Sequence, residues 1–463
     1  MRLAEIAAVV GGRVEPEHAG VEVVAPAAID SRVVEPGGLF VALAGEHTDG
    51  HAFVGAAADR GAAAVLAARP VGAPYVLVDD PAAALSLLAA EVRRRLRGCA
   101  VIGITGSQGK TSVKDLLAQV LAAQGATVAT AGNFNNEIGV PLTLLRADAS
   151  TRYLVVEMGA RHVGNIAELC ALARPDVGVV LNVGSAHVGE FGSREAIAQA
   201  KGELVEALSA DGTAVLNASD EAVVAMRSRT AARVSTFGAD EEADVAVRDV
   251  VLRRDGTVEA DLRLAGRWSR LRLGLLGAHQ ATNAAAAAAA ALAVGITPDV
   301  IVRELGAASP RSAWRMERAV TPDGVVVVND AYNANPESTA SALRTLAAMT
   351  PTDAASYAVL GEMLELGGAA ARAHADVGSL AAELGLTHVV AVGAGAHGVH
   401  DAARAAGAAS VAVADVTEAV GWLRTRIRPG DVVLVKASRA SGLDRVAAAL
   451  LEPRDFDEGD DAR

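Results

Sequence analysis

An apolar run leads into a glycine-rich loop in the stretch Ala100-Val101-Ile102-Gly103-Ile104-Thr105-Gly106-Ser107-Gln108-Gly109-Lys110-Thr111-Ser112. Glycines let backbone N–H groups approach a polyphosphate, and the N-terminus of the helix predicted over residues 112–124 adds a favourable dipole. Lys110 would neutralise β- and γ-phosphate oxygens, and Thr111 would offer its hydroxyl to Mg²⁺. The loop has the short form G-x-x-G-K-T, because Ile104 stands where the longer pattern has glycine. The alternative, a glycine-rich turn with an exposed lysine, is disfavoured because strand, loop and helix agree.

Strand and helix patterns alternate on both sides of this loop, which is typical of doubly wound parallel sheets. The sequence divides into three blocks: a smaller N-terminal α/β domain (1–98), a central P-loop-type doubly wound ATPase domain (99–308) and a C-terminal Rossmann-like domain (309–463). Strands are predicted at 21–25, 39–43, 63–67 and 75–78 in the first block, at 100–104, 153–156, 177–181 and 213–216 in the second, and at 325–328, 356–360, 388–392, 410–413 and 432–435 in the third. The fold class is therefore α/β, with a second parallel sheet in the third block.

Length and composition agree with this division. The chain has 463 residues, about three times the roughly 150 residues of a typical domain. Only 3% of the residues are aromatic, so Ala, Val and Leu must fill the core. The formal charge of −13 argues against a general nucleic-acid or anionic-membrane binder, although a local basic site can still hold a phosphate. Cys99 and Cys170 are the only cysteines, which excludes a disulfide framework and a four-cysteine zinc site.

No targeting or membrane-spanning segment stands out. The first twelve residues lack a basic region followed by an apolar stretch, and the alanine-rich run 284–294 is too short to span a bilayer. A soluble, cytoplasmic protein is expected.

Candidate metal ligands follow two predicted strands. Glu157 follows the run 153–156 directly, and His187 lies just after the run 177–181, at the sheet edge where ligands bind in open α/β sheets. Glu157 could coordinate Mg²⁺ opposite the phosphate loop, or it could be a solvated loop acid. An isolated histidine is more often structural than a ligand, and by pattern alone Lys201 is a surface helix lysine.

These motifs together resemble the Mur ligases, the ATP-dependent amide-forming enzymes of peptidoglycan precursor synthesis, which are related to folylpolyglutamate synthetase. The resemblance implies that the segment Ala200-Lys201-Gly202-Glu203 carries a carbamylated lysine, whose new carboxylate helps to hold a second Mg²⁺. The implied metal ligands are Thr111, Glu157, His187 and the Lys201 carbamate. The implied ATP loop consists of Gly106, Ser107, Gln108, Gly109, Lys110 and Thr111.

Three further segments extend the resemblance. Gly277 to Asn283 is similar to the family's G-x-H-N-x-x-N, so Asn283 is expected to contact adenine, although Gln280 replaces the usual asparagine. Without the resemblance, His279 and Asn283 could equally cap or buttress a helix. Trp314-Arg315-Met316-Glu317 resembles G-R-M-E with Trp314 in place of glycine, and it implies that Arg315 reaches the γ-phosphate. Asn329 to Pro336 resembles D-x-Y-N-A-N-P, which implies that Asp330 binds the ribose.

Other segments resemble the branch of the family that adds D-alanyl-D-alanine. These are residues 133–141, 157–160, 332–336 and 360–367, while Val435-Lys436-Ala437-Ser438-Arg439 is similar to V-K-G-S-R with Ala437 replacing glycine. The Asp-Asn-Pro-Arg signature of the diaminopimelate-adding ligase is absent. Asp30-Ser31-Arg32 and Asp49-Gly50-His51 resemble the segment that grips the UDP end of the nucleotide-sugar, with Ser31 and Arg32 as binding residues, although the first could be an ordinary turn.

The resemblance implies a reaction and a set of partners. ATP would phosphorylate the terminal carboxylate of UDP-N-acetylmuramoyl-tripeptide, and the amine of D-alanyl-D-alanine would attack the acyl phosphate. Lys110, Lys201, His187 and Arg315 are the expected catalytic residues, ATP and two Mg²⁺ the cofactors, and the protein is expected to act as a monomer. Two alternatives remain: a non-catalytic binding protein that keeps the nucleotide fold, and a related ligase with a different acceptor, such as a folate glutamyl ligase.

Overall fold

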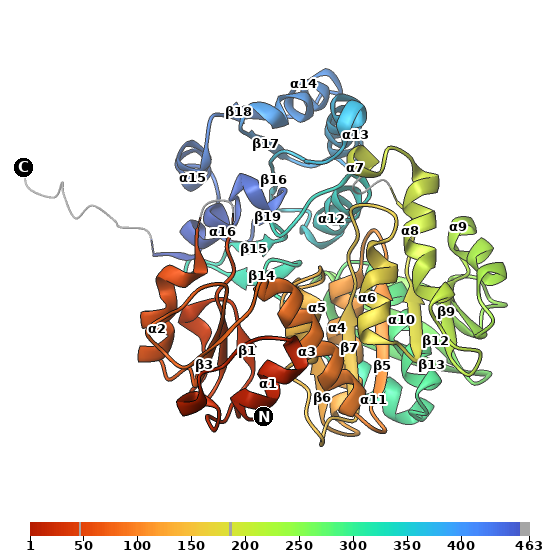
Figure 1. Ribbon diagram of the computed structural model, residues 1–463. Coiled ribbons are helices and arrows are strands. Elements are labelled where there is room, and N and C mark those ends of the chain that lie inside the picture. The colour runs from red at the N-terminus through yellow and green to blue at the C-terminus, as the bar shows by residue number, and fades with distance from the viewer. Residues whose placement is uncertain (46–47, 185–187, 454–463) are drawn as a thin grey trace, which may run out of the picture.

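The computed structural model describes residues 1–45, 48–184 and 188–453. Its strands form three sheets, and each sheet uses one continuous part of the chain: strands within residues 27–77, 100–276 and 317–436. In Figure 1 the first sheet and its helices lie at the lower left, the second at the lower right and the third above both. The α/β architecture predicted from the sequence is confirmed.

The central sheet has nine strands in the order β13-β12-β11-β10-β9-β8-β5-β7-β6. Apolar residues of its two faces form two separate core clusters, so helices cover the sheet on both sides. The strands are β5 (Ala100–Thr105), β6 (Thr127–Ala129), β7 (Tyr153–Glu157), β8 (Val177–Val180), β9 (Thr213–Asn217), β10 (Arg233–Gly238), β11 (Val245–Leu252), β12 (Thr257–Leu264) and β13 (Arg267–Leu276). The helices are α4 (Lys110–Ala122), α5 (Gly139–Leu144), α6 (Asn165–Ala173), α7 (Val188–Phe191), α8 (Arg194–Glu206), α9 (Glu221–Val224), α10 (His279–Ala293) and α11 (Pro298–Ala307).

Helix α10 is the buried helix of this part. Its alanines from Ala284 to Ala291 are at most 1% exposed and belong to one core cluster with residues of α4. A methyl side chain lets two helices pack closely, and both α4 and α10 begin at the same end of the sheet. The alanine-rich composition therefore serves helix packing in the core.

The three edge strands β11, β12 and β13 were not predicted, and they pair antiparallel. Two short turns carry the signals that the prediction overlooked: Asp255-Gly256 between β11 and β12, and Ala265-Gly266 between β12 and β13. Ala265 and Gly266 both have positive φ, as a two-residue hairpin turn requires. The central sheet is therefore parallel from β6 to β11, and a meander extends one edge.

The C-terminal sheet has the order β14-β15-β19-β16-β17-β18. The second parallel sheet predicted from the sequence is confirmed for its five predicted strands, β15 to β19. One edge strand, β14, was not predicted, and it pairs antiparallel with β15 because the turn that joins them is too short for a crossover. The strands are β14 (Glu317–Val320), β15 (Val326–Asn329), β16 (Ser356–Leu360), β17 (His388–Val392), β18 (Ser410–Val413) and β19 (Val432–Lys436). The helices are α12 (Pro336–Met349), α13 (Ala370–Glu383), α14 (His397–Ala405), α15 (Val416–Arg424) and α16 (Asp444–Leu451).

The N-terminal sheet is parallel and has the order β1-β2-β3-β4. The strand predicted at residues 21–25 is wrong: that segment makes one isolated bridge, between Arg2 and Glu22. Asp80 caps the helix over residues Pro81–Arg95 by accepting hydrogen bonds from its first turn, at 2.8 Å from the Ala82 N–H. The elements are β1 (Ala27–Ala28), β2 (Leu39–Val41), β3 (Ala64–Ala67), β4 (Tyr75–Leu77), α1 (Leu3–Val10), α2 (Val54–Asp59) and α3 (Pro81–Arg95).

Direct hydrogen bonds join the central and C-terminal parts. The Ser341 hydroxyl on α12 lies 2.9 Å from His279 Nδ1 on α10, and the Gly189 N–H on α7 donates to the Glu365 carbonyl at 3.1 Å. The central and C-terminal parts are therefore in direct contact, with the C-terminal part above the central part in Figure 1. Within the described residues, no helix is long and apolar enough to cross a membrane.

Candidate active site

A cavity of about 1130 Å³ lies between the central and C-terminal parts. The carboxyl ends of β5 and β7 open into it, as expected for a ligand site in an open α/β sheet. Its lining includes predicted residues from both parts: Ser107, Gln108, Gly109, Lys110, Thr111, Glu157, Lys201 and Asn283 from the central part, and Arg315 and Asp330 from the C-terminal part.

The phosphate loop is held in one shape by close contacts. Gly109 has φ +81°, and a Cβ there would lie 2.7 Å from Asn283 Oδ1, so only glycine fits. A Cβ at Gly106 would lie 2.8 Å from the Cβ of Leu181. Asn182 fastens the loop to β8: its carbonyl accepts from the Ser107 N–H at 3.1 Å, and its Oδ1 accepts from the Gln108 N–H at 2.9 Å. Asn182 was not among the predicted site residues.

The loop lysine points back over the loop. Lys110 Nζ donates to the Gly106 carbonyl at 2.7 Å. Burial lowers the pKa of Lys110, the nearby Glu157 carboxylate raises it, and the Arg315 guanidinium lowers it again. Two cations from different parts of the chain therefore share this end of the cavity, which favours a polyanionic ligand.

Glu157 ends β7 and is 1% exposed. Its Oε2 accepts from the Thr111 hydroxyl at 2.9 Å, and its Oε1 accepts from Asn135 Nδ2 at 2.7 Å. A carboxylate, a hydroxyl and an amide oxygen are hard oxygen donors of the kind that Mg²⁺ prefers, so the residues present fit this ion. Asn135 was quoted in a motif but not predicted as a site residue.

Lys201 lies on α8 with only 4% of its surface exposed, and it reaches the cavity wall. It is therefore not the surface lysine that the pattern alone indicates. Burial, and then the charge of Lys110, hold the pKa of Lys201 well below its ordinary value. The neutral amine is consequently favoured, and this is the form that reacts with electrophiles. The other predicted ligand of this group, His187, lies outside the described residues.

The segment expected to hold adenine starts α10. Asn283 Nδ2 donates to Gln280 Oε1 at 3.0 Å, and both side chains are at least nine-tenths buried. His279 contacts Ser341 on α12, and burial lowers the pKa of its imidazole. Asn283 therefore lies where the phosphate loop, α10 and the cavity meet.

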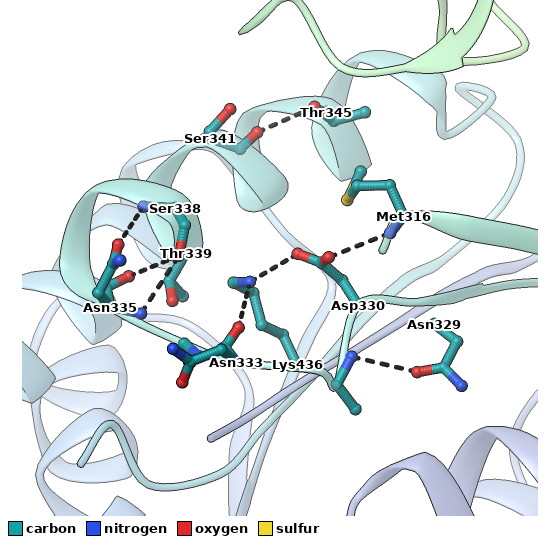
Figure 2. Close-up of polar contacts among 12 residues, drawn as sticks. Met316, Asn329, Asp330, Asn333, Asn335, Ser338, Thr339, Ser341, Thr345 and Lys436 are labelled. Carbon is teal, nitrogen blue, oxygen red and sulfur yellow. Dashed lines mark hydrogen bonds and ion pairs between the residues drawn. The ribbon is translucent and has the colours of Figure 1, made fainter. Parts of the chain in front are cut away.

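Asp330 has both carboxylate oxygens engaged, as Figure 2 shows. Its Oδ2 lies 2.6 Å from Lys436 Nζ, and its Oδ1 accepts from the Met316 N–H at 3.0 Å. Lys436 is 3% exposed and also donates to the Asn333 carbonyl at 2.9 Å. This lysine fixes the loop between β15 and α12, and its place in the motif at the end of β19 was the only sequence signal for it.

Arg315 comes from the segment between α11 and β14. Its guanidinium carbon lies 4.1 Å from the centre of the Tyr332 ring, a cation–π contact that orients the side chain. Arg315, Tyr332 and the phosphate loop all line the same cavity. The structure thus brings together a loop lysine, a planar cation from the other part and a buried carboxylate.

The same parts of the chain match known families. Mur ligase middle domain matches residues 104–291, Mur ligase glutamate ligase domain matches 314–439, and Mur ligase family catalytic domain matches 27–93. The chain is 46% identical to the UDP-N-acetylmuramoyl-tripeptide--D-alanyl-D-alanine ligase of Mycobacterium tuberculosis strain H37Rv, over 97% of this chain and 98% of the relative.

This chain belongs to the Mur ligase family.

Other members of the Mur ligase family agree along most of the chain. The ligase of the same description from Escherichia coli K12 is 37% identical, over 91% of this chain and 93% of the relative. Among solved structures, MurF from Acinetobacter baumannii has a TM-score of 0.85 with 30% identity, covering 98% and 99% of the two chains. MurF from Thermotoga maritima in complex with ADP has a TM-score of 0.77 with 31% identity, covering 93% and 97%.

The predicted nucleotide-sugar residues of this Mur ligase lie apart from the cavity. Arg32 is largely exposed and pairs with Asp30 at 2.7 Å, and that guanidinium lowers the pKa of Asp30 to about 2. Ser31 beside it is buried. Within the described residues, none of the first 98 lines the cavity. Ser31 and Arg32, which are adjacent in the chain, therefore lie outside the cavity that contains the phosphate loop.

Lysine is rare in this Mur ligase. The chain has four lysines among its 42 basic residues: Lys110, Lys114, Lys201 and Lys436. Three of them line the cavity. Lys114 lies one turn further along α4, is 2% exposed, and donates to the Thr130 carbonyl at 2.9 Å, just before the loop that carries Asn135. Every lysine therefore lies in the site or supports one of its loops.

Proposed function

We propose that this chain is an ATP-dependent ligase that joins D-alanyl-D-alanine to UDP-N-acetylmuramoyl-tripeptide in peptidoglycan precursor synthesis. A terminal carboxylate oxygen of the tripeptide attacks the γ-phosphorus of ATP, which gives an acyl phosphate and ADP. The amine of the dipeptide then attacks the acyl carbon, loses a proton, and expels inorganic phosphate from a tetrahedral intermediate. The observation that carries this proposal is the phosphate loop facing Arg315 across one cavity, together with the near full-length similarity to ligases of that description.

The chain's own groups are assigned to the nucleotide as follows. Backbone N–H groups of residues 106–111 cradle the phosphates, and Lys110 and Arg315 offset the charge that builds up when two anions are brought together. Asn283 contacts adenine. Asp330, oriented by Lys436 and the Met316 N–H, binds the ribose.

Thr111, Glu157, His187 and a carbamate on Lys201 are the proposed ligands of two Mg²⁺ ions, which would neutralise phosphate oxygens when bound. The buried, neutral amine of Lys201 supports carbamylation, because CO₂ adds to an uncharged amine and releases one proton. The positive charge of Lys110, which disfavours an ammonium at Lys201, favours a carbamate anion at the same place.

Each of the three parts of the chain binds a different substrate in this proposal. We assign the nucleotide-sugar to residues 1–98 with Ser31 and Arg32, ATP to residues 99–308, and the dipeptide to residues 309–463. We propose a monomer as the working unit. Dependence on ATP and on a nucleotide-activated precursor supports a cytoplasmic location.

The proposal is tested by measuring ADP release with a panel of dipeptides and UDP-muramoyl peptides. We expect release only when D-alanyl-D-alanine and the UDP-tripeptide are both present. Release with glutamate and a folate instead would favour the related glutamyl ligase, and nucleotide binding without any release would favour a binding protein.

Replacing Glu157 with glutamine tests the metal assignment. The glutamine side chain in Glu157→Gln has the shape of glutamate and keeps one oxygen that can accept a hydrogen bond from Thr111 or Asn135, but it carries no negative charge. The Mg²⁺ concentration for half-maximal ADP release should therefore rise at least about tenfold. The matched control is Glu195→Gln, which removes the same charge from an exposed site in the first turn of α8. An unchanged Mg²⁺ dependence in Glu157→Gln would contradict the assignment.

A further inference from the structure

A buried ammonium group on α4 holds one short segment of the chain. Lys114 lies one turn after Lys110 and is 2% exposed. Its Nζ donates to the Thr130 carbonyl at 2.9 Å and to the Gly132 carbonyl at 3.3 Å, and it forms an ion pair with Asp115 Oδ1 at 2.9 Å. An ammonium has three N–H donors, so these three oxygens can use all of them.

The segment that this lysine holds has little apolar packing. Residues 131–134 are exposed, and a Cβ at Gly132 would have no other atom within 4 Å. Beyond them, the Asn135 carbonyl accepts from the Gly159 N–H at 2.8 Å. Hydrogen bonds therefore give the segment its shape, and those from Lys114 restrain its beginning.

The same segment contacts Glu157 at two points. The Thr130 hydroxyl accepts from the Glu157 N–H at 3.0 Å, and Asn135 Nδ2 donates to Glu157 Oε1 at 2.7 Å. The other carboxylate oxygen, Oε2, accepts from the Thr111 hydroxyl at 2.9 Å. Lys114, Thr130 and Glu157 are each at most 2% exposed, so water has little access to these groups. The backbone and the carboxylate of Glu157 are therefore both fixed by the segment that Lys114 restrains.

The contacts of Lys114 indicate what its buried charge does. A buried charge loses its hydration, and apolar side chains of similar size that replace a buried ion pair often leave stability unchanged or improve it. Lys114 does not line the cavity, so direct contact with a ligand there is not its role. Two of its three acceptors are main-chain carbonyls of the segment that carries the partners of Glu157.

We propose that Lys114 is a positioning residue that holds the Glu157 carboxylate in place to bind Mg²⁺, acting through residues 130–135. This inference rests on the metal assignment in the proposed function and adds a residue that touches neither the metal nor a substrate. Groups that orient a metal ligand usually affect metal affinity by about 10- to 100-fold. Lys114 acts one contact further away, so an effect near the lower end of this range is expected.

The test measures metal binding without turnover. Mn²⁺ accepts the same oxygen ligands as Mg²⁺, and the EPR signal of free Mn²⁺ reports how much metal is bound. The ion is titrated into enzyme mixed with β,γ-methylene-ATP, with the enzyme in excess so that little free nucleotide takes up the metal. The Mn²⁺ dissociation constant of Lys114→Met should be about tenfold above that of the wild type.

A double variant separates positioning from a general loss of stability. If the two residues acted independently, effects of about tenfold in Lys114→Met and in Glu157→Gln would multiply to about 100-fold in the double variant. Because Lys114 acts through Glu157, the double variant should instead bind Mn²⁺ within about threefold of Glu157→Gln alone.

Arg146→Met is the matched control. Arg146 is exposed and donates to the Ala129 carbonyl at 2.8 Å, so this variant also removes a bond from a cation to a main-chain carbonyl, one residue before Thr130. Its Mn²⁺ dissociation constant should stay within about twofold of the wild-type value, as expected for an exposed contact. Thermal unfolding of every variant is measured on the same samples.

Thr130→Val provides an answer if Lys114→Met does not fold. Valine has the size of threonine but lacks the hydroxyl that accepts from the Glu157 N–H, so the Mn²⁺ dissociation constant should rise several-fold. An unchanged constant in folded Lys114→Met or in Thr130→Val, or multiplying effects in the double variant, would overturn the inference alone. An unchanged constant in Glu157→Gln would contradict the metal assignment and the inference together.

Discussion

Lys201→Ala should lower turnover by at least about 1000-fold, and a short carboxylic acid such as formate or acetate should restore part of it. The alanine removes the amine that would carry the carbamate and leaves a space beside the phosphate loop. A small carboxylate that enters this space would supply the missing anionic oxygens near Lys110. Rates of ADP release with increasing formate, at saturating substrates, measure both effects.

Lys201→Arg is the matched control for this rescue. Arginine keeps a positive charge and fills the space but does not form a carbamate, so the variant should be inactive and insensitive to formate. A second readout is independent of turnover: ¹³C-labelled bicarbonate should give the wild type a carbamate resonance that both variants lack. A fully active Lys201→Ala enzyme would refute the carbamate.

Lys110→Met should lower ADP release by about 1000-fold or more while leaving the fold intact. Methionine has a similar length but carries no charge, so the negative charge of the transferring phosphoryl group is no longer offset. Because burial lowers the pKa of Lys110, folding disfavours its protonated form below the ordinary lysine pKa. The unfolding temperature of Lys110→Met at neutral pH should therefore equal or exceed that of the wild type.

The control for this variant is Arg372→Met, which removes a positive charge from the surface of α13 and should retain activity. Thermal unfolding and ADP release are measured on the same samples. A Lys110→Met protein that loses activity only because it unfolds at a lower temperature would contradict the assignment, since the loss would then be structural.

Local sequence signals predicted the parallel strands well. The runs that became β5, β7, β8 and β9 are short, continuous and apolar because both faces of the sheet are covered, and such runs stand out in a sequence. The meander β11–β13 was missed although β12 alternates strictly, from Thr257 to Leu264, between less and fully buried positions. Its turns at Asp255-Gly256 and Ala265-Gly266 are typical hairpin signals, so the meander was predictable from the sequence.

Some residues of the candidate site were likewise predictable from the sequence and others were not. The phosphate loop was predictable because loop, strand and helix are consecutive in the chain. The partners Asn182, Asn135 and Lys436 were not, because each contact joins segments at least 22 residues apart, such as the 106 residues between Lys436 and Asp330. Burial of Lys201 is likewise a tertiary property, and the pattern of α8 alone placed this residue on the surface.

The scarcity of lysine has a practical consequence for chemical probes. Amine-directed electrophiles usually label many surface lysines, whereas here the only amines are those of Lys110, Lys114, Lys201, Lys436 and the N-terminus of Met1. The Met1 ammonium donates to the Val23 carbonyl, far along the chain from the phosphate loop. A nucleotide that carries an aldehyde or sulfonyl fluoride would therefore have very few competing amines to react with. The labelled residue could be identified by analysing very few peptides.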